Sequence, residues 1–478
     1  MTTFEQEKQA QEAWRPRPGH DLRKLCDRLL VEEFLREEKL TQRRRAKLKT
    51  LIELAMAQTP YYAEKLNGLD RSVLSFDNPA ALAELPILTK ADVHLRREDL
   101  VARQLPRGHE IVQRRSSSGT TGPPAVVYHS TASAVLWPLH KQREYRWFRF
   151  DPSGVMASIR TPGQIPQVSG SRELELGEVA PFPHWPNVGP YFETGESFGF
   201  NCWNPVDDKR DWLNELEPDY LTTYPETMEH IAFAAADVPL VRSFKGLHAI
   251  SEMMTPDMAR RIERAFEVPI DQNYGLSEIG VVAVKCREGG RYHVHDEFAV
   301  VEIVDDDGRP VAPGETGRLL VTCLENLAMP LIRYDTGDLA TATSGDCPCG
   351  RTLPSFGAIV GRYYRIAFLP DGTFQKVYVL RDAFETMERD LAAPLRMFQV
   401  QHYRDDSFEL RLVAARPLSD ALVAHFFEAW EAALGPEPPP LRVVQVDDIA
   451  RGPGGKFHDF MSEFFPSPDE SDAPSPGE

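Results

Sequence analysis

Cysteine, long apolar runs and excess positive charge are all scarce in this sequence, and each scarcity excludes a class of protein. Six cysteines in 478 residues are too few for a disulfide scaffold, which indicates a reducing compartment. No apolar run approaches the roughly 20 residues that a membrane helix needs, so we expect no membrane partner. With 72 acidic and 54 basic side chains, the formal net charge of -18 argues against a nucleic-acid partner.

The ends of the chain carry little sign of packed structure. Residues 1–20 are polar and contain two prolines, so we expect a loosely ordered lead-in there. The first eight residues lack a basic region followed by an apolar run, so we expect no signal peptide and a cytoplasmic protein. Residues 467–478 are rich in proline, serine and acidic residues, which predicts a disordered tail. The chain is too long for one core, which predicts two or three domains.

A hydroxyl-rich loop is the most informative stretch. Residues 116–124 read Ser-Ser-Ser-Gly-Thr-Thr-Gly-Pro-Pro between two predicted strands, at residues 110–112 and 125–128. Free backbone N–H groups and threonine hydroxyls in such a loop suit phosphate oxygens. No Lys-Ser/Thr pair closes the loop, so it is not a P-loop. The alternative interpretation is an ordinary Ser/Gly-rich turn.

The middle of the chain alternates between strand and helix patterns, which predicts an α/β sheet with crossover helices. Helical spacing occurs twice between residues 21 and 57, and Thr89 is a predicted N-cap. Ligands gather at the carboxyl ends of such strands, where Ser251-Glu252 and Tyr274–Glu278 fall. The predicted helices here cover residues 211–216, 226–236 and 256–266, and the predicted strands cover residues 220–225 and 246–252 and begin again at 270.

The last third of the chain contains two regions with different predicted secondary structure. Strands are predicted at residues 298–304, 317–323 and 331–334. Beyond residue 361 the order strand, helix, two strands, helix, strand is the split βαβ pattern of a small α+β domain. Its elements are predicted at residues 374–379, 380–391, 397–403, 408–414, 420–434 and 441–446.

Five short motifs in a fixed order carry a resemblance to a known family. They are Ser117–Gly122, Tyr274–Glu278, Ile332–Asp338, Gly361-Arg362 and Gly454–Lys456. This ordered set resembles the adenylate-forming superfamily of acyl-CoA ligases, adenylation domains and luciferases. Residues 59–62, residues 85–92 and the cysteine pattern look like its phenylacetate-CoA ligase branch. The resemblance implies an α/β fold with a large multi-sheet adenylating domain at 21–361 and a small mobile α+β domain at 362–466.

The resemblance also implies residue roles. Lys456 would be catalytic and swing against the carboxylate oxygen and the α-phosphate, while Glu278 and Thr120 would bind Mg²⁺. Taken singly, Asp338 would be an ordinary turn residue and Lys456 an exposed lysine, and it is the ordered set that favours the functional roles. The implied ATP and AMP contacts are Ser117, Ser118, Gly119, Thr120, Thr121, Gly122, Ser251, Glu252, Asn273, Tyr274 (adenine), Gly275, Ser277, Asp338 (ribose) and Arg362.

Two positions depart from the family pattern. Pro123 stands where a lysine is usual in the phosphate loop, which removes a flexible cation. Tyr363-Tyr364 replace the charged pair of the hinge about which the small domain rotates between its two arrangements. The altered hinge leaves acyl-adenylate formation expected and puts the use of CoA as acceptor in question.

The cysteines carry a separate signal. Cys286, His293, Cys347 and Cys349 offer three thiolates and one imidazole, which suit a tetrahedral structural Zn²⁺ with no open position. A similar arrangement is found in part of the phenylacetate-CoA ligase branch. The spacing is not a standard zinc-finger one, His295 is an alternative ligand, and buried free thiols are the alternative to a metal site.

The sequence therefore predicts an ATP-dependent ligase that converts a carboxylic acid to an acyl adenylate and then to a CoA thioester. Two alternatives stay open: transfer to an amine or a carrier-protein thiol, and a non-catalytic nucleotide-binding relative. The acid is expected to be aromatic or heteroaromatic, and the oligomeric state, including a homodimer, is left open. The expected pocket residues are Tyr224, His248, Ala249, Gly275 and Gly280, with Trp185, Tyr191, Phe192 and Phe198 as further aromatic candidates.

Overall fold

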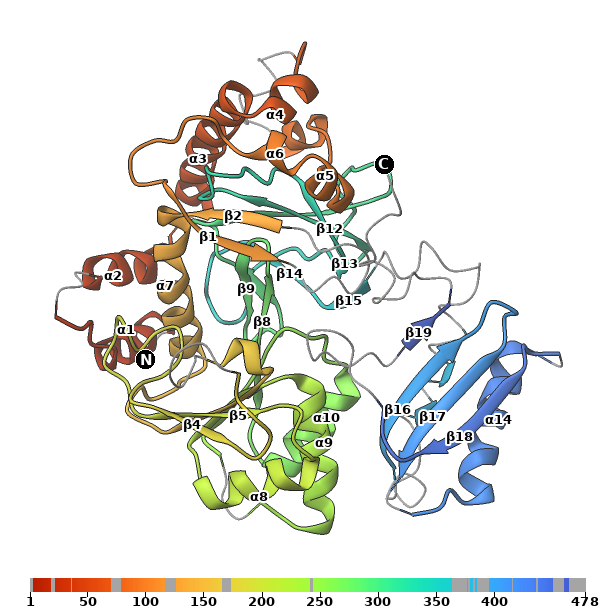
Figure 1. Ribbon diagram of the computed structural model, residues 1–478. Coiled ribbons are helices and arrows are strands. Elements are labelled where there is room, and N and C mark those ends of the chain that lie inside the picture. The colour runs from red at the N-terminus through yellow and green to blue at the C-terminus, as the bar shows by residue number, and fades with distance from the viewer. Residues whose placement is uncertain are drawn as a thin grey trace.

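The fold is described from a computed structural model of the whole chain (Figure 1). The residues described are 3–18, 22–35, 37–69, 79–116, 126–165, 173–240, 244–362, 376, 379–380, 383–384, 395–414, 416–435, 437–449 and 460–463. The predictions for Pro123, Tyr363-Tyr364, Gly454–Lys456 and the tail at 467–478 lie outside the described residues. Within the described part of the chain, no helix is long and apolar enough to cross a bilayer.

The first residues are folded into the body of the protein, so the prediction of a loosely ordered lead-in at 1–20 is wrong for most of that stretch. Thr3–Ala13 form helix α1, which contacts helix α7 (Thr131–Trp147). Glu7 and Trp14 are almost fully buried. The polar pattern was misleading because the buried carboxylate of Glu7 is paired with arginines from distant segments. The helices that follow are α2 (Arg23–Glu32), α3 (Glu37–Gln58) and α4 (Pro60–Lys65).

A nine-stranded mixed sheet forms the centre, in the order β14-β10-β9-β8-β7-β6-β3-β5-β4. Its middle strands β5, β3, β6, β7 and β8 are parallel, and the flanking pairs are antiparallel. The strands are β3 (Met156–Arg160), β4 (Val179–Phe182), β5 (Ser197–Asn201), β6 (Tyr220–Thr223), β7 (Gly246–Ala249), β8 (Ile270–Leu276), β9 (Gly280–Lys285), β10 (Tyr292–Val294) and β14 (Ser355–Phe356).

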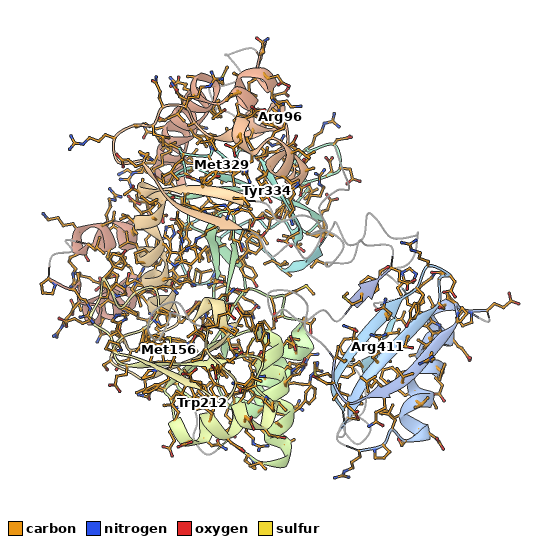
Figure 2. All side chains as sticks on the ribbon, viewed as in Figure 1. Arg96, Met156, Trp212, Met329, Tyr334 and Arg411 are labelled. Carbon is orange, nitrogen blue, oxygen red and sulfur yellow. The ribbon has the colours of Figure 1, made fainter. Side chains whose placement is uncertain are left out.

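The crossover helices of this sheet confirm the predicted alternation. They are α8 (Val206–Leu216), α9 (Pro225–Asp237) and α10 (Pro256–Phe266). The predicted helices match α9 to within one residue at each end and α10 fully, whereas the helix predicted at 211–216 covers only the second half of α8. Proline at the first position of α9 and α10 suits a helix start, since no N–H is needed there. Their apolar sides join an apolar cluster with β6 and β7. Figure 2 shows Met156 of β3 and Trp212 of α8 in this part of the molecule.

Two smaller sheets complete the large part of the protein. A four-stranded antiparallel sheet has the order β11-β12-β13-β15, and β1 pairs with β2 as an antiparallel hairpin. Thr89 caps helix α5 with a full capping box, as predicted. The remaining elements are β1 (Ile111–Ser116), β2 (Val126–Ser130), β11 (Ala299–Val304), β12 (Thr316–Cys323), β13 (Tyr334–Thr341), β15 (Ile359–Arg362), α5 (Lys90–Leu95), α6 (Arg97–Leu100), and the 3₁₀ turns Pro79–Glu84 and Pro162–Gln164.

The strand predicted at residues 331–334 is wrong, since β13 begins only at Tyr334. Arg333 has a left-handed backbone with φ of 49°. Its buried guanidinium donates to the carbonyl oxygens of Leu85 at 2.7 Å and Gly308 at 2.6 Å and pairs with Glu302. Tertiary hydrogen bonds to this one side chain therefore hold a bend where apolar residues predict a strand.

Residues 395–463 build a separate sheet with its own core (Figure 1). The order β18-β17-β16-β19 combines one antiparallel pair with two parallel ones. Lys376 and Val379 are helical where the sequence predicts a strand, and β19 was not predicted at all. Phe233 of α9 packs against this core. The elements are β16 (Leu395–His402), β17 (Phe408–Ala414), α14 (Asp420–Leu434), β18 (Leu441–Val446) and β19 (Phe460–Ser462).

Helix α7 was not predicted from the sequence. It contacts β1, β2, β9 and α1, and its last ten residues are all buried although four of them are charged. Glu33 pairs with Arg143 and Arg146, and also accepts from the Trp147 indole at 2.9 Å. Arg351, far along the chain, contacts Glu33 as well. These charges are tolerated inside the protein because each has an opposite charge beside it.

We predict that Glu33→Ala lowers the free energy of unfolding by about 3–5 kcal/mol, because three buried guanidinium groups lose a shared partner. Equilibrium urea unfolding followed by tryptophan fluorescence measures the loss. The matched control is Glu53→Ala, whose exposed carboxylate lies 3.9 Å from Lys49 and should contribute less than about 1 kcal/mol. Equal losses in the two variants would contradict the importance assigned to the buried network.

Candidate functional site

Tyr274 and Asp338, two predicted nucleotide contacts, are brought together from different sheets. Tyr274 ends the buried part of β8, and its hydroxyl donates to Asp338 Oδ2 at 2.7 Å. Asp338 lies on β13 opposite Arg362 of β15, so the backbones of these two predicted site residues are adjacent. The Asp338 backbone N–H is held by Thr336 Oγ1 at 3.1 Å. The carboxylate is therefore fixed in direction by neighbours on two strands.

Glu278 lies on the turn between β8 and β9, next to the same place. Its Oε1 accepts from the hydroxyl of Tyr334 at 2.9 Å, and both side chains are buried. Figure 2 shows Tyr334 in the upper part of the molecule, at the four-stranded sheet that contains β13. The hydrogen bond positions a carboxylate at the end of the parallel strands, where a cation or a phosphate group would be recognised in an α/β sheet.

Gly275 and Gly280 frame that turn, and close approach explains both glycines. A Cβ at Gly275 would lie 2.9 Å from the carbonyl oxygen of Gly280. A Cβ at Gly280 would lie 3.2 Å from the Trp137 ring, and its φ of +117° is one that other residues rarely adopt. The turn is thus packed directly against helix α7.

Ser251 and Glu252 follow β7 at the same edge of the sheet. Ser251 has a left-handed backbone with φ of 66°, and the Glu252 N–H donates to the Ile250 carbonyl at 2.9 Å. A serine in this region of backbone space is uncommon and often marks a functional turn. Ser251 is exposed, which leaves it accessible at the rim of the site.

His248, Ala249 and Asn273 lie deeper, inside a buried polar network. His248 Nε2 is 3.2 Å from the side-chain amide of Asn273, which donates to Glu144 at 2.6 Å. Lys141 Nζ donates to the same Glu144 oxygen at 2.8 Å. Burial, with help from the nearby Lys141 charge, lowers the pKa of His248 well below its usual value. At neutral pH this histidine is uncharged and serves as a hydrogen-bonding spacer between strands.

Most aromatic residues of the predicted pocket are packed in the core. Trp185 and Phe192 are fully buried in the core that surrounds Trp14, and Tyr224 is buried with its hydroxyl bonded to Gln164 at 2.9 Å. Phe198 packs against the core of the central sheet. These rings pack against the N-terminal segment and the crossover helices. The sequence analysis did not predict these contacts. Tyr191 alone of these predicted aromatics lines the cavity described next.

A cavity of about 390 Å³ opens between the β1–β2 hairpin, helix α7 and the Ile279-Gly280 turn. Besides Gly280 and Tyr191, its wall contains residues that the sequence analysis missed. Trp137 and His140, three apart on α7, could have been found as one helical face. Arg115 could have been noticed as the last cation before the hydroxyl loop. The missed residues used below are Arg115, His129, Trp137, His140 and Phe298.

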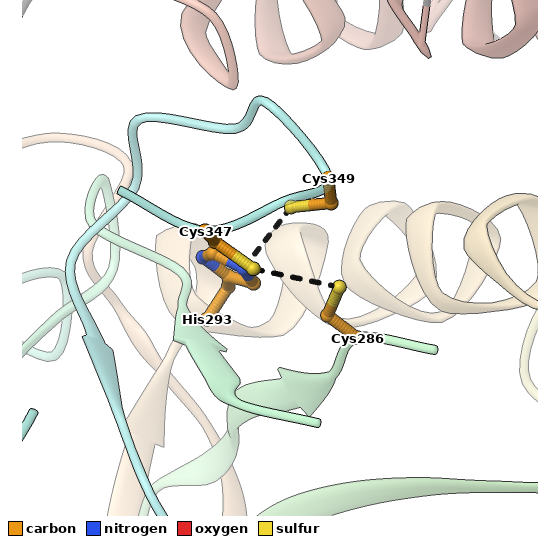
Figure 3. Close-up of side chains that lie close together, drawn as sticks. All are labelled: Cys286, His293, Cys347 and Cys349. Atoms are coloured by element: carbon orange, nitrogen blue, oxygen red, sulfur yellow. Dashed lines mark hydrogen bonds between the residues drawn. The ribbon is translucent and has the colours of Figure 1, made fainter. Parts of the chain in front are cut away.

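Cys286, His293, Cys347 and Cys349 form one buried cluster, and their ligand atoms all lie within 4.8 Å of one another (Figure 3). Cys286 follows β9, His293 is on β10, and the other two lie in the loop before β14. The Cys349 sulfur is 3.3 Å from His293 Nε2, and the Cys286 and Cys347 sulfurs are 3.8 Å apart. Donation from Cys286, and then from His293, holds the pKa of Cys349 well below its usual value.

The alternative ligand His295 is excluded from this cluster. Its Nδ1 accepts from Arg143 at 2.7 Å, and its ring stacks on His140 with centroids 4.3 Å apart. His293 instead has its Nδ1 3.3 Å from the Leu353 carbonyl, which leaves Nε2 directed at the sulfurs. Backbone N–H groups of Gly289 and Arg351 donate to the Cys286 and Cys349 sulfurs at 3.3 and 3.5 Å. The donor set and its outer hydrogen bonds fit a tetrahedral metal site.

Several predicted site residues cannot be placed. Ser117, Ser118, Gly119, Thr120, Thr121 and Gly122 lie outside the described residues, as does Lys456, and only the backbone of Arg362 is described. The flanking strands are placed, however, and they pair up to Ser116 and Val126. Residues 117–125 therefore connect the two ends of one hairpin.

Comparisons with known proteins give sequence relatives and a shared fold. No protein-family model matches the chain. The chain is 27% identical over 336 residues to a phenylacetate-coenzyme A ligase of Thermus thermophilus, covering 69% of this chain and 72% of that one. It is 25% identical to a phenylacetate-coenzyme A ligase of Escherichia coli, over 66% and 69%. The solved structure of 2-hydroxyisobutyryl-CoA ligase with 2-HIB-AMP matches with a TM-score of 0.67 at 18% identity, over 90% and 91% of the two chains.

We predict that Tyr274→Phe lowers the free energy of unfolding by about 1–3 kcal/mol, because Asp338 loses a buried hydrogen bond to its carboxylate. Urea unfolding measures this without reference to any activity. Tyr128→Phe is the matched control, since the structure gives the Tyr128 hydroxyl no hydrogen-bond partner among the described residues. A control variant as unstable as Tyr274→Phe would show that the contact with Asp338 contributes nothing specific.

Proposed function

We propose that this chain, a sequence relative of the phenylacetate-coenzyme A ligases with the fold of adenylate-forming acyl-CoA ligases, activates a carboxylic acid with ATP and transfers it to CoA. The observation that carries the proposal is the convergence of Tyr274, Glu278 and Asp338 at the carboxyl end of β8, where a hydrogen bond joins the nine-stranded sheet to the four-stranded one. All three come from motifs of that superfamily, and buried hydrogen bonds orient both carboxylates. Such orientation suits binding of a nucleotide and its metal ion.

The reaction has two steps. The carboxylate of the acid attacks the α-phosphorus of ATP, so an acyl adenylate forms and pyrophosphate leaves. The sulfur of CoA then attacks the acyl carbon, a thioester forms, AMP leaves and the thiol proton passes to solvent. The first step brings two anions together, so positive charge and N–H groups are needed where charge develops. Mg²⁺ would supply part of that charge, held by Glu278 and by Thr120.

The nucleotide roles follow the position of each residue. Tyr274 would lie beside the adenine, with its hydroxyl fixing Asp338 to accept the ribose hydroxyls. Arg362, whose backbone neighbours Asp338 on β15, would reach the ribose and the α-phosphate. Residues 117–122 would hold the β- and γ-phosphates from the end of the β1–β2 hairpin. Ser251, Glu252, Asn273, Gly275 and Ser277 would complete the walls.

The acid is proposed to be aromatic or heteroaromatic. The cavity beside Gly280 has rings from Trp137, Tyr191 and Phe298 in its wall, and aromatic walls suit a flat apolar ring. This cavity replaces the set around Tyr224 and His248 as the proposed pocket. Those two residues lie inside hydrogen-bonded networks and would support the pocket from behind.

Two domains would divide the work. Residues 21–361 would bind ATP and the acid, and residues 362–466 would carry Lys456 to the α-phosphate. The Tyr363-Tyr364 pair at the junction is the reason to keep an amine or a carrier-protein thiol as the alternative acceptor. CoA is preferred because the sequence relatives are CoA ligases.

The cysteine cluster is proposed to hold a structural Zn²⁺ through Cys286, His293, Cys347 and Cys349. Four protein ligands leave no open position, so the ion would tie the loop before β14 to β9 and β10 and take no part in the reaction.

We expect purified wild-type protein to contain about one Zn²⁺ per chain, as a fully occupied four-ligand site implies. Cys349→Ala should lose most of it and unfold at a lower temperature, as measured by elemental analysis and calorimetry. Cys323→Ala, which removes a buried thiol of β12 outside the cluster, should keep the metal. Metal-free wild-type protein of full stability would refute the zinc proposal.

The test of the function is pyrophosphate release over a panel of aryl and short-chain acids, each with and without CoA, with products weighed by mass spectrometry. Acyl-CoA formation is the expected result. An acyl adenylate that accumulates beside unused CoA would move the acceptor to an amine or a carrier protein. No release with any acid would refute the ligase proposal, and ATP binding alone would then favour a nucleotide-binding role.

Lys456→Ala should reduce acyl-adenylate formation by at least about a thousandfold, because the developing charge loses its mobile cation. ATP binding, measured by calorimetry, should change little. Arg416→Ala removes an exposed cation of the same small domain and should leave both unchanged. Unaltered adenylation in Lys456→Ala would remove that lysine from the catalytic residues.

A further inference from the structure

The cavity beside Gly280 has a charge pattern opposite to that of the whole chain. The protein carries 72 acidic against 54 basic side chains. The cavity wall nevertheless contains the cation Arg115 and no aspartate or glutamate among the described residues, with His129 and His140 as further polar groups. Burial lowers the pKa of His129 to about 4, so it is uncharged at neutral pH, and His140 Nε2 lies 3.0 Å from Glu297 Oε1 outside the wall. A wall without carboxylates inside an acidic protein favours an anion in the cavity.

Arg115 is the strongest of these groups, because no carboxylate in the described part of the chain pairs with it. The structure gives it no hydrogen bond or ion pair within the described part of the chain, and its guanidinium lies 4.7 Å from the centre of the Trp137 ring. Burial lowers the pKa of Arg115. The buried arginines 143, 146 and 351 differ, since each of them faces at least one carboxylate. A half-buried cation left unpaired beside a cavity is costly unless a ligand completes it.

Two further polar atoms at the cavity are buried without a partner. His129 is 6% exposed, and its Nε2 has no hydrogen-bond partner among the described residues. The Trp137 Nε1–H is also buried and has no partner there. Each such group lowers the stability of the fold when it is left unsatisfied. Most buried polar atoms in native proteins are satisfied, so two orphans beside one unpaired arginine indicate a ligand site.

The cavity is continuous with the proposed adenylation site. Ile279 and Gly280 line it, and they directly follow Glu278 along the chain. His129 hydrogen-bonds to the backbone of Ser277, which fixes the hairpin against the same turn. An acid whose carboxylate reaches the nucleotide at Glu278 would therefore extend its far end along Gly280 toward Trp137 and Arg115.

We propose that the acid activated by this protein carries a second anionic group at its far end, and that Arg115 binds this group together with the Trp137 Nε1–H and His129. The proposal rests on the adenylating function and names the class of its substrate. Trp137 and Phe298 would contact the body of the acid, and Arg115 would neutralise the second charge. An anion beside His129 would favour its protonated form, which donates from Nε2.

The test compares paired acids with and without a second carboxylate in the pyrophosphate-release assay without CoA. The pairs are benzoate against isophthalate and terephthalate, phenylacetate against its ring-carboxylated derivatives, and butyrate against glutarate. Omitting CoA ensures that any anion selectivity comes from the acid and not from the phosphates of CoA. The measured quantity is the ratio of kcat/KM for the dicarboxylate to kcat/KM for the monocarboxylate of the same pair.

We expect at least one dicarboxylate to have a higher kcat/KM than the matching monocarboxylate in wild-type protein. Arg115→Met should lower that ratio by about tenfold to a hundredfold, mainly through KM, because a charge-assisted contact is lost. Trp137→Phe keeps a ring and removes the N–H, and should lower the ratio several-fold. Arg114→Met, an exposed arginine next to Arg115 on β1, is the control and should leave the ratio unchanged.

Three results would overturn the proposal, and they are distinguishable. If wild-type protein activates every monocarboxylate as well as or better than the matching dicarboxylate, the second anionic group is refuted and the ligase function is retained. An equal fall for both members of a pair in Arg115→Met would make Arg115 a structural residue. Absence of pyrophosphate release with every acid would refute the adenylating function, and the substrate class would fall with it.

Discussion

The burial of helix α7 with its charges is the constraint on which the packing of the N-terminal helices and the central sheet depends. A helix that carries lysine, arginine and glutamate side chains into the interior must find an opposite charge for each of them. The partners of its two arginines are Glu7 of α1, Glu33 just after α2 and Glu297 between β10 and β11, which are far apart in the sequence. Arg351 shares Glu7 and Glu33 with them. Burial of α7 therefore requires that all these segments are in place, so the N-terminal helices are packed together with the rest of this part of the protein.

The same helix connects the candidate sites. Its first turns present Trp137 and His140 to the cavity, and Lys141 and Glu144 hold Asn273 just before Tyr274. Its last turn places the Trp147 ring edge-on to His293 of the cysteine cluster, with centroids 6.0 Å apart. One rigid element thus sets the spacing between the cavity, the end of β8 and the proposed metal site. A metal ion at the cluster would act on the cavity only through this helix and the sheet it covers.

The sequence predicted the elements whose local signals agree with their environment. Helix α10 was predicted from its apolar spacing with proline at its start, and the capping box at Thr89 was found because it lies within four residues. Tyr274 and Asp338 were found as family motifs, but their hydrogen bond joins two sheets and cannot be read from spacing. The four cysteine-cluster residues were predicted from their chemistry, and the structure adds which histidine belongs to the set.

The wrong predictions have one physical cause. In each case contacts with residues distant in the sequence, and not the local sequence pattern, determine the structure. Charged residues normally predict a solvent-exposed segment, so α1 and α7 were not recognised as buried. Arg333 turns the chain where apolar residues predict a strand, because distant carbonyl groups satisfy its guanidinium. Aromatic residues such as Trp185 were assigned to a pocket, although they pack around Trp14. Each of these misassignments involves a partner more than a hundred residues away.

The two ends of helix α7 differ in how well they tolerate substitution. Ser133, Ala134 and Trp137 line the cavity, and exchanging them alters its shape without breaking an ion pair of the helix. Arg143 and Arg146, one and two turns further, each neutralise buried carboxylates, so their exchange leaves unpaired charge inside the protein. A fold of this kind can change the acid it accepts through the cavity-lining end of α7 while its buried charged end stays fixed. Substrate choice in this protein is therefore expected to depend on the first two turns of α7 and on Arg115 opposite them.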